Sequence, residues 1–140
     1  MLLLDSDHMS LLQRGGAEAQ RIRQRLRAVP PDDVATTIIS FEEQMRGWLS
    51  RIARAATLDR QIADYLDLKQ FLQYYCNVAV VEFDTRAAEE FERLQKAKIR
   101  IGTMDLKIAA IALANGATLL TRNLSDFNKV PGLRIEDWSA

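Results

Sequence analysis

The sequence has very little of the two residue types that build most zinc and thiol-based sites. Its 140 residues include one cysteine, Cys76, and one histidine, His8. A Cys/His zinc site cannot be assembled, and an internal disulfide is excluded, which fits a reducing cytoplasm. Nothing around either residue indicates a Cys–His nucleophilic pair. We expect His8 in a turn or a first helical turn, and Cys76 as a small buried side chain.

The chain also lacks a net charge and any long apolar stretch. Lys plus Arg and Asp plus Glu number 19 each, so any charged binding site must be local. No stretch is long enough to span a bilayer, and the opening MLLL lacks the basic and hydrophobic regions of a signal peptide. With 48% apolar and 27% charged residues, we expect a soluble cytoplasmic protein whose residues 1–140 form one domain.

What the sequence does have is an alternation of short apolar runs with longer amphipathic segments. Strands are predicted at residues 2–4, 34–40, 78–83 and 117–121, with a short edge strand at 133–138. Helices are predicted at residues 16–28, 40–56, 58–76, 84–98 and 103–115, the last with Thr103 as its cap. This alternation predicts an α/β fold with a mainly parallel sheet of four to five strands. Ligands of such sheets bind beyond the carboxyl ends of the strands.

Carboxylates are abundant, and four of them lie where predicted strands end or the next helices begin. They are Asp5, Glu43, Asp105 and Asp126. Such a cluster is costly without a cation, because like charges raise one another's pKa values. Oxygen ligands without His or Cys suit magnesium or manganese, and such ions serve phosphodiester hydrolysis by activated water.

Each of these acids also has a local structural alternative. Asp5 could cap a helix, and Asp126 could hold a turn. Glu43 is the fourth residue of SFEE, a capping box that begins at Ser40, and the neighbouring Glu42 is equally available to a site. Asp105 would favour the helix dipole near a helix start. Their joint placement, rather than any single acid, indicates a metal site.

At this point the residues resemble a known family, the PIN-domain ribonucleases, and in particular the short VapC-type toxins of toxin–antitoxin pairs. LLLDSDHMS is similar to the opening motif, a strand followed by Asp, Ser or Thr, and usually Asn. IISFEEQMRG is similar to the second motif, in which the acid four residues before a glycine is the ligand; this register selects Glu43 over Glu42. IGTMDLKIAAIALANGATLLTRNLSDF is similar to the third and fourth motifs and is the most specific stretch.

The resemblance implies a three-layer α/β/α PIN-like fold and RNA cleavage dependent on Mg²⁺ or Mn²⁺. It implies that Asp5, Glu43 and Asp105 bind the metal and that Asp126 is a more variable fourth acid. The residues that would orient these acids or their waters are Ser6, Asp7, Thr121 and Asn123. Asp7 stands where the family usually has Asn, and we expect it to hold the turn by accepting backbone N–H groups.

The resemblance further implies a homodimer and a cognate antitoxin that inserts a segment into the acidic site. Arg46 and Arg122 are the arginines that we expect to contact RNA phosphate. The aromatic helices at 40–56 and 58–76 could form a hairpin with excess apolar surface for a partner.

Two other functions remain open from the sequence. One is a PIN-like domain that binds RNA or a partner without cutting. The other is a haloacid-dehalogenase-like phosphatase, whose Asp-x-Asp motif is similar to Asp5-Ser6-Asp7. That family also needs a later acidic pair, whereas GTMD offers a single acid at Asp105, and 140 residues leave little room for its cap elements.

Overall fold

Five short strands in the computed structural model, which describes residues 1–140, form one sheet that is parallel throughout. The strands are β1 (Leu2–Leu4), β2 (Val34–Thr37), β3 (Val80–Val81), β4 (Thr118–Leu120) and β5 (Arg134–Glu136). The helices are α1 (Ser6–Arg14), α2 (Ala17–Leu26), α3 (Ile38–Arg54), α4 (Leu58–Tyr75), α5 (Thr85–Lys96), α6 (Thr103–Ala114) and α7 (Leu124–Phe127). A 3₁₀ turn, Pro31–Asp33, precedes β2.

The strand order is β3-β2-β1-β4-β5, so the first strand of the chain is the central one. The chain builds outward from β1 through β2 to β3 and then crosses to the other side of β1 with β4. The order therefore switches between β1 and β4, which is where ligands of open parallel sheets bind. Residues that follow β1 and β4 flank this position.

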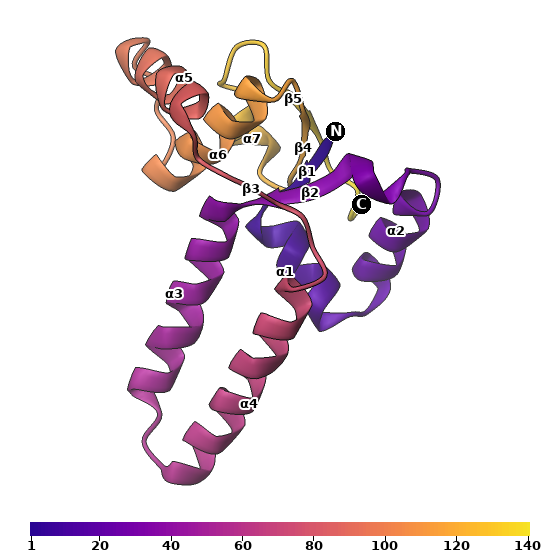
Figure 1. Ribbon diagram of the computed structural model, residues 1–140, viewed down its shortest axis with the longest axis vertical. Helices are drawn as coiled ribbons and strands as arrows, with labels where there is room; N and C mark the ends of the chain where they lie inside the picture. Colours follow the sequence, from indigo (N-terminus) through magenta and orange to yellow (C-terminus); the bar gives the residue numbers. More distant parts are fainter.

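Helices cover both faces of the sheet, as expected for a three-layer α/β/α fold (Figure 1). Successive residues of a strand point to opposite faces. Leu3 and Leu119 pack with the apolar residues of α5 and α6, whereas Leu4 and Leu120 pack with α1, α2 and α4. Leu3 and Leu4 are at most 2% exposed, so packing on both faces of the sheet holds β1 in place and fixes the position of the residue that follows it.

Helices α3 and α4 form an antiparallel hairpin that projects away from the sheet (Figure 1). Its inner side holds an aromatic cluster, in which Phe41, Phe71 and Tyr75 lie with ring centroids 4.9 to 5.5 Å apart. Its outer side carries large apolar residues that are more than half exposed: Leu58, Ile62, Tyr65, Leu66 and Leu72. No helix of the structure is both long and apolar enough to cross a membrane.

The predicted elements are confirmed, but several of their ends were wrong. The strand predicted at 34–40 ends at Thr37, which caps α3 by accepting a hydrogen bond from the backbone N–H of Ser40. Ser40 is therefore inside the helix, and the predicted capping box with Glu43 does not form. A threonine at the end of a β-branched run can serve as both the last strand residue and the cap.

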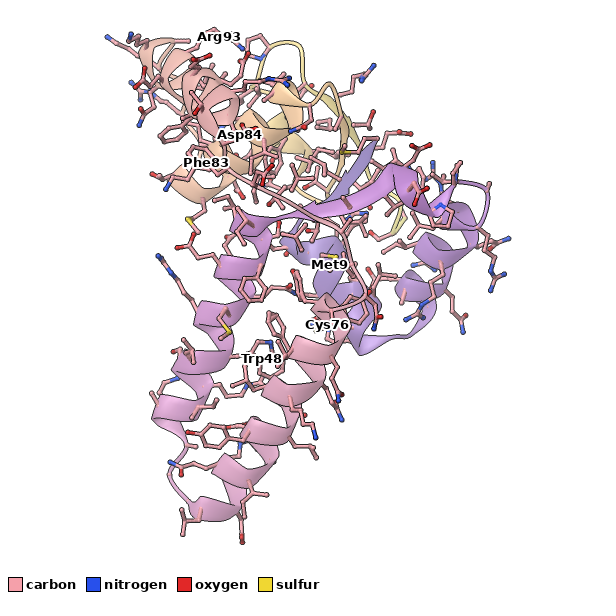
Figure 2. The ribbon with its side chains drawn as sticks, in the orientation of Figure 1. Met9, Trp48, Cys76, Phe83, Asp84 and Arg93 are labelled. Atoms are coloured by element: carbon pink, nitrogen blue, oxygen red, sulfur yellow. The ribbon has the colours of Figure 1, made fainter.

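Three further details differ from the predictions. The strand predicted at 78–83 is reduced to Val80–Val81 at the edge of the sheet. Thr103 does not cap α6, because it is the first helical residue and Gly102 occupies the cap position. Cys76 is exposed rather than buried, since it lies at the carboxyl end of α4, outside the aromatic cluster (Figure 2).

Candidate metal centre and nucleic-acid site

Asp5 lies directly after β1 and is 4% exposed. Its Oδ1 accepts the backbone N–H of His8 at 3.0 Å, so Asp5 is the N-cap of α1, the local role that the sequence left open. Its Oδ2 has no hydrogen-bond partner in the protein. One carboxylate oxygen is thus used by the fold, and the other is available to a ligand.

Glu43 comes to the same place from the second turn of α3. Ser6 Oγ donates to Glu43 Oε1 at 2.8 Å, which joins the start of α1 to α3 across 37 residues of sequence. Burial raises the pKa of Glu43, the Ser6 hydroxyl lowers it, and the charges of Asp5 and Asp7 raise it. Glu42 instead pairs with Arg46 at the surface, at 2.5 Å, so Glu43 is the member of this acidic pair that faces the strand ends.

Asp105 completes the group from the first turn of α6. Its pKa is raised to about 6, first by burial and then by the charges of Glu43 and Asp5. Mutual repulsion of this kind requires the carboxylates to lie close together. The structure therefore brings Asp5, Glu43 and Asp105 to the carboxyl edge of the sheet, as the sequence predicted.

Asp7 belongs to the same group but is more open to solvent. Burial and the charge of Asp5 raise its pKa, and the charge of Arg122 lowers it. Asp7 lies in the first turn of α1, and none of its side-chain oxygens accepts a hydrogen bond from the protein. The expected turn-holding bond is absent, and the helix cap is made by Asp5 instead.

Asp126 lies at the border of the acidic group. Its carboxylate accepts hydrogen bonds from Asn123 Nδ2 at 3.0 Å and from Lys129 Nζ at 3.2 Å, and these bonds lower its pKa. Asp126 nonetheless contributes to the raised pKa of Asp105. Thr121 is fully buried, and its Oγ1 accepts the backbone N–H of Asn123, so both residues shape the turn that carries Asp126.

The two arginines predicted to contact RNA have acidic neighbours. Arg46 is bound to Glu42 along one side of α3. Arg122 lies 3.3 Å from Glu18 of α2 and is close enough to Asp7 to lower its pKa. Arg122 is therefore the one that lies beside the acids.

His8 is a structural member of the site whose importance the sequence did not reveal. It is fully buried in the first turn of α1, and its Nε2 accepts the backbone N–H of Trp138 at 3.2 Å. The ring proton is therefore on Nδ1, which lies 3.5 Å from Asp5 Oδ1. His8 thus links Trp138 to the start of α1, next to Asp5. His8 and Trp138 are 130 positions apart in the sequence, so only the tertiary structure could reveal this contact.

The donor set suits a hard divalent cation, since it consists of carboxylate oxygens and holds excess negative charge. As the side chains stand, no group of three or more His, Cys, Asp or Glu residues is arranged to hold a metal ion. Asp5 Oδ1 and Glu43 Oε1 are engaged with His8 and Ser6, whereas the second oxygen of each has no protein partner. Shared coordination therefore requires rotation of these side chains.

Comparison with known proteins identifies the family. The model of the PIN domain matches residues 2–133. The chain belongs to the PIN-domain family. This assignment leaves no place for a haloacid-dehalogenase fold, in line with the acidic pair missing at Asp105.

Curated relatives match parts of this PIN domain. The chain is 31% identical over 84 residues to the tRNA(fMet)-specific endonuclease VapC of Salmonella typhimurium, covering 57% of this chain and 64% of that protein. It is 42% identical over 45 residues to ribonuclease VapC2 of Rickettsia felis, covering 32% of this chain and 34% of that one. The matches thus span less than two thirds of these relatives' lengths.

Solved structures share the PIN fold over the whole chain. VapBC-1 from nontypeable Haemophilus influenzae is similar with a TM-score of 0.76 at 21% identity, covering 99% of this chain and 98% of that chain. DNA-bound VapBC from Salmonella typhimurium gives a TM-score of 0.74 at 23% identity, covering 98% and 97%. The five-stranded parallel sheet between helices is therefore the fold seen in these structures.

Proposed function

We propose that this PIN domain is an endoribonuclease that depends on a divalent metal ion, with residues 1–140 acting as a single nuclease unit. The observation that carries the proposal is the convergence of Asp5, Glu43 and Asp105 at the carboxyl edge of the sheet, where burial and then the charges of Glu43 and Asp5 raise the pKa of Asp105 to about 6. Three acids from three distant segments repel one another here, and a dication such as Mg²⁺ or Mn²⁺ would remove that repulsion.

In this proposal Asp5, Glu43 and Asp105 hold the metal ion through carboxylate oxygens, and Asp126 acts on its waters from the border. A bound dication supplies an activated water and neutralises charge on the phosphate. Ser6 holds Glu43 in place through its 2.8 Å hydrogen bond, and Asn123 holds Asp126. Because a metal-activated water needs no protein nucleophile, hydrolysis by water is the reaction that the residues support.

The proposed biological role is that of a toxin in a toxin–antitoxin pair, acting in the cytoplasm on cellular RNA. Similarity to proteins named VapC, and a shared fold with VapBC complexes, support this role. The partner would be an antitoxin that covers the acidic site. The acids attract a basic side chain for the same reason that they attract a dication.

We also propose that the protein forms a homodimer. The outer side of α4 exposes Leu58, Ile62 and Leu66 by 56 to 76%. An exposed apolar stripe of this length on a projecting hairpin is typical of a protein–protein interface.

Cleavage of RNA by the purified protein tests the enzymatic proposal. We expect Mg²⁺- or Mn²⁺-dependent cleavage that falls at least about 100-fold in Asp5→Asn and Asp105→Asn, because each substitution removes a ligand charge. Asp32→Asn, an exposed acid outside the site, is the matched control. Equal activity in the wild type and both site variants would overturn the assignment. Absence of both cleavage and metal binding would favour a non-catalytic binding domain.

The toxin role has its own test in cells. Induced expression of the wild-type chain should arrest growth, and Asp105→Asn should relieve the arrest at equal protein level. Growth arrest that persists in Asp105→Asn would mean that toxicity does not depend on the acidic site.

A further inference from the structure

A polar pocket of about 660 Å³ opens between α1, α3 and α4, next to the acidic site but separate from it. Its wall combines polar amides and hydroxyls with three arginines and half-buried aromatic rings. The wall residues include Ser10, Gln13, Arg14, Trp48, Arg51 and Arg54. None of these residues was singled out as part of a nuclease site from the sequence motifs.

The pocket lies next to the acidic site along α1 and α3, and both helices contribute residues to each. On α1, Ser6 contacts Glu43, and Ser10 follows one turn later, where it accepts a hydrogen bond from Gln44 Nε2 at 2.9 Å. On α3, Trp48 and Arg51 lie one and two turns beyond Gln44. Eight residues of helix separate Glu43 from Arg51, a rise of about 12 Å. A strand whose phosphate lies at the acids can therefore place a neighbouring nucleotide in the pocket.

The charge of the pocket is opposite to that of the acidic site. Arg14 and Arg54 form no ion pair, and Arg51 lies 3.8 Å from the only acid of the wall, Asp67. The wall therefore carries an excess of two positive charges beside a cluster of carboxylates. An excess of this sign, held on a protein without net charge, favours an anionic ligand such as a phosphate.

Flat surfaces for a base are also present. The guanidinium of Arg51 stacks over the ring of Trp48, 4.8 Å from its centroid, and its side chain is 49% exposed. Figure 2 shows Trp48 between α3 and α4. Arginine planes and aromatic rings are the groups on which RNA-binding proteins stack unpaired bases.

One buried amide donor of the wall, Gln13 Nε2, has no hydrogen-bond partner. Tyr75 donates to Gln44 Oε1, and Gln44 Nε2 donates to Ser10 and, at 3.5 Å, to Gln13 Oε1. This chain of bonds fixes the orientation of the Gln13 amide and leaves its Nε2 buried without a partner. A buried donor without a partner is costly, and a ligand that carries acceptors would satisfy it.

We infer that this pocket, defined by Gln13, Arg14, Trp48, Arg51 and Arg54, binds a nucleotide of single-stranded RNA next to the scissile phosphate. The inference rests on the proposed function and adds a substrate-binding subsite to it. Arg14 and Arg54 contact phosphate, the Arg51–Trp48 pair stacks with the base, and Gln13 donates a hydrogen bond to the base edge. The excess positive charge and the stacking surface together favour RNA over a peptide.

The test is a binding measurement that needs no cleavage. The reporter is Trp138→Phe, which leaves Trp48 as the only tryptophan; the indole N–H of Trp138 is buried without a partner, so phenylalanine loses no hydrogen bond there. An eight-nucleotide single-stranded RNA in EDTA should quench Trp48 fluorescence to saturation. Arg14→Ala with Arg54→Ala should weaken binding about tenfold and reduce the salt dependence by about 0.7 in slope for each arginine.

Arg27→Ala is the matched control, because Arg27 is an exposed arginine directly after α2 and forms no ion pair. It should leave the affinity and the salt slope unchanged. The inference would be overturned if RNA did not quench Trp48 in the Trp138→Phe reporter. It would also be overturned if the double arginine variant bound RNA as tightly as the Arg27→Ala control. Quenching by an acidic polyglutamate peptide but not by RNA would assign the pocket to a protein partner and overturn it equally.

A parallel cleavage assay separates this inference from the proposed function. Where the wild type cleaves RNA, the double variant should raise KM about tenfold with kcat unchanged, since a remote subsite contributes uniform binding. Cleavage without any response of Trp48 to RNA would overturn the pocket alone. A Trp48 response and the arginine dependence without any cleavage would overturn the nuclease assignment and leave the pocket as an RNA-binding site.

Discussion

At the residue scale, the acids of the site differ in how many of their carboxylate oxygens are already hydrogen-bonded within the protein and how many are available to a ligand. Asp5 uses one oxygen to cap α1, and Glu43 uses one to bind Ser6. The Asp105 carboxylate accepts no hydrogen bond from the protein, and burial, followed by the charges of Glu43 and Asp5, raises its pKa to about 6. The negative charge of Asp105 is therefore destabilising in the folded protein without metal, through burial first and repulsion second.

Replacement of Asp105 should stabilise the protein without metal. Because the folded pKa of about 6 lies above the ordinary value of 3.8, the folded state holds its proton longer than the unfolded state. Stability is therefore lost as pH rises from about 4 to 6, and the full cost remains above pH 6. Asp105→Asn removes this cost, about 1 kcal/mol at pH 7.5 once solvent screening of the partly exposed carboxyl is included.

Urea denaturation in EDTA at pH 7.5 and at pH 4.5 measures this effect. The gain of Asp105→Asn over the wild type should be larger at pH 7.5. Asp32→Asn is the control, since it lies in the exposed turn before β2. A gain that is equal at both pH values would show that the Asp105 charge is not its source.

Metal affinity should increase as pH rises, whereas the stability of the metal-free wild type decreases. Protons compete with the ion for Asp105, so affinity should fall as pH drops through about 6. In thermal denaturation, 10 mM Mg²⁺ or Mn²⁺ at constant ionic strength should stabilise the wild type by about 1 kcal/mol at pH 7.5 and less at pH 5. Asp5→Asn should show no such stabilisation at either pH; an equal shift in this variant would place the metal elsewhere.

At the element scale, the β2–α3 junction is what points Glu43 at the strand ends. Thr37 is both the last strand residue and the N-cap of α3, and it is fully buried. Its Oγ1 accepts from the backbone N–H of Ser40 at 3.0 Å and lies 3.1 Å from the Ser40 hydroxyl. The first turn of α3, and with it the position of Glu43, depends on this one hydroxyl.

Thr37→Val should therefore destabilise the protein, although valine fills the same volume. Loss of the cap and of the buried hydroxyl contact should lower the free energy of unfolding by about 1–2 kcal/mol. Thr37→Ser keeps the hydroxyl and loses only a methyl group, so it should be the milder change. Urea denaturation of the two variants checks the order, and a less stable serine variant would show that packing dominates here.

At the scale of the whole molecule, the projecting hairpin of α3 and α4 has more apolar surface than a monomer needs. Leu58, Ile62, Tyr65 and Leu66 recur at helical spacing, so they lie along one side of α4. The same hairpin carries two of the pocket's arginines, Arg51 and Arg54, on another side. One pair of helices thus offers distinct surfaces for a second copy and for a ligand.

The dimer is tested by placing a charge within this stripe. Leu66→Glu should shift the molar mass from dimer to monomer in light scattering after gel filtration, because burying an unpaired carboxylate in an apolar interface is costly. Ala63→Glu adds the same charge on the flank of the same helix and should leave the dimer intact. A wild-type protein that is monomeric at all concentrations would contradict the proposed interface.

The sequence by itself determined the alternation of strands and helices, the parallel sheet, and the acids at the strand ends. These follow from local patterns: β-branched runs, amphipathic periodicity, and carboxylates that come directly after apolar segments. It predicted less well which residue ends each element, since Thr37 and Gly102 took cap positions expected at Ser40 and Thr103. Caps depend on which neighbouring polar groups are buried, and local sequence does not encode burial.

Only the tertiary structure decided how segments distant in sequence meet. The Ser6–Glu43 bond, the raised pKa of Asp105, the contact of His8 with Trp138, and the arginine pocket all join residues from different elements. The spacing of residues along one chain cannot specify the distance between two helices. The crossing of the chain from β3 to β4 fixes that distance, because it sets the strand order and so brings the acids to one edge.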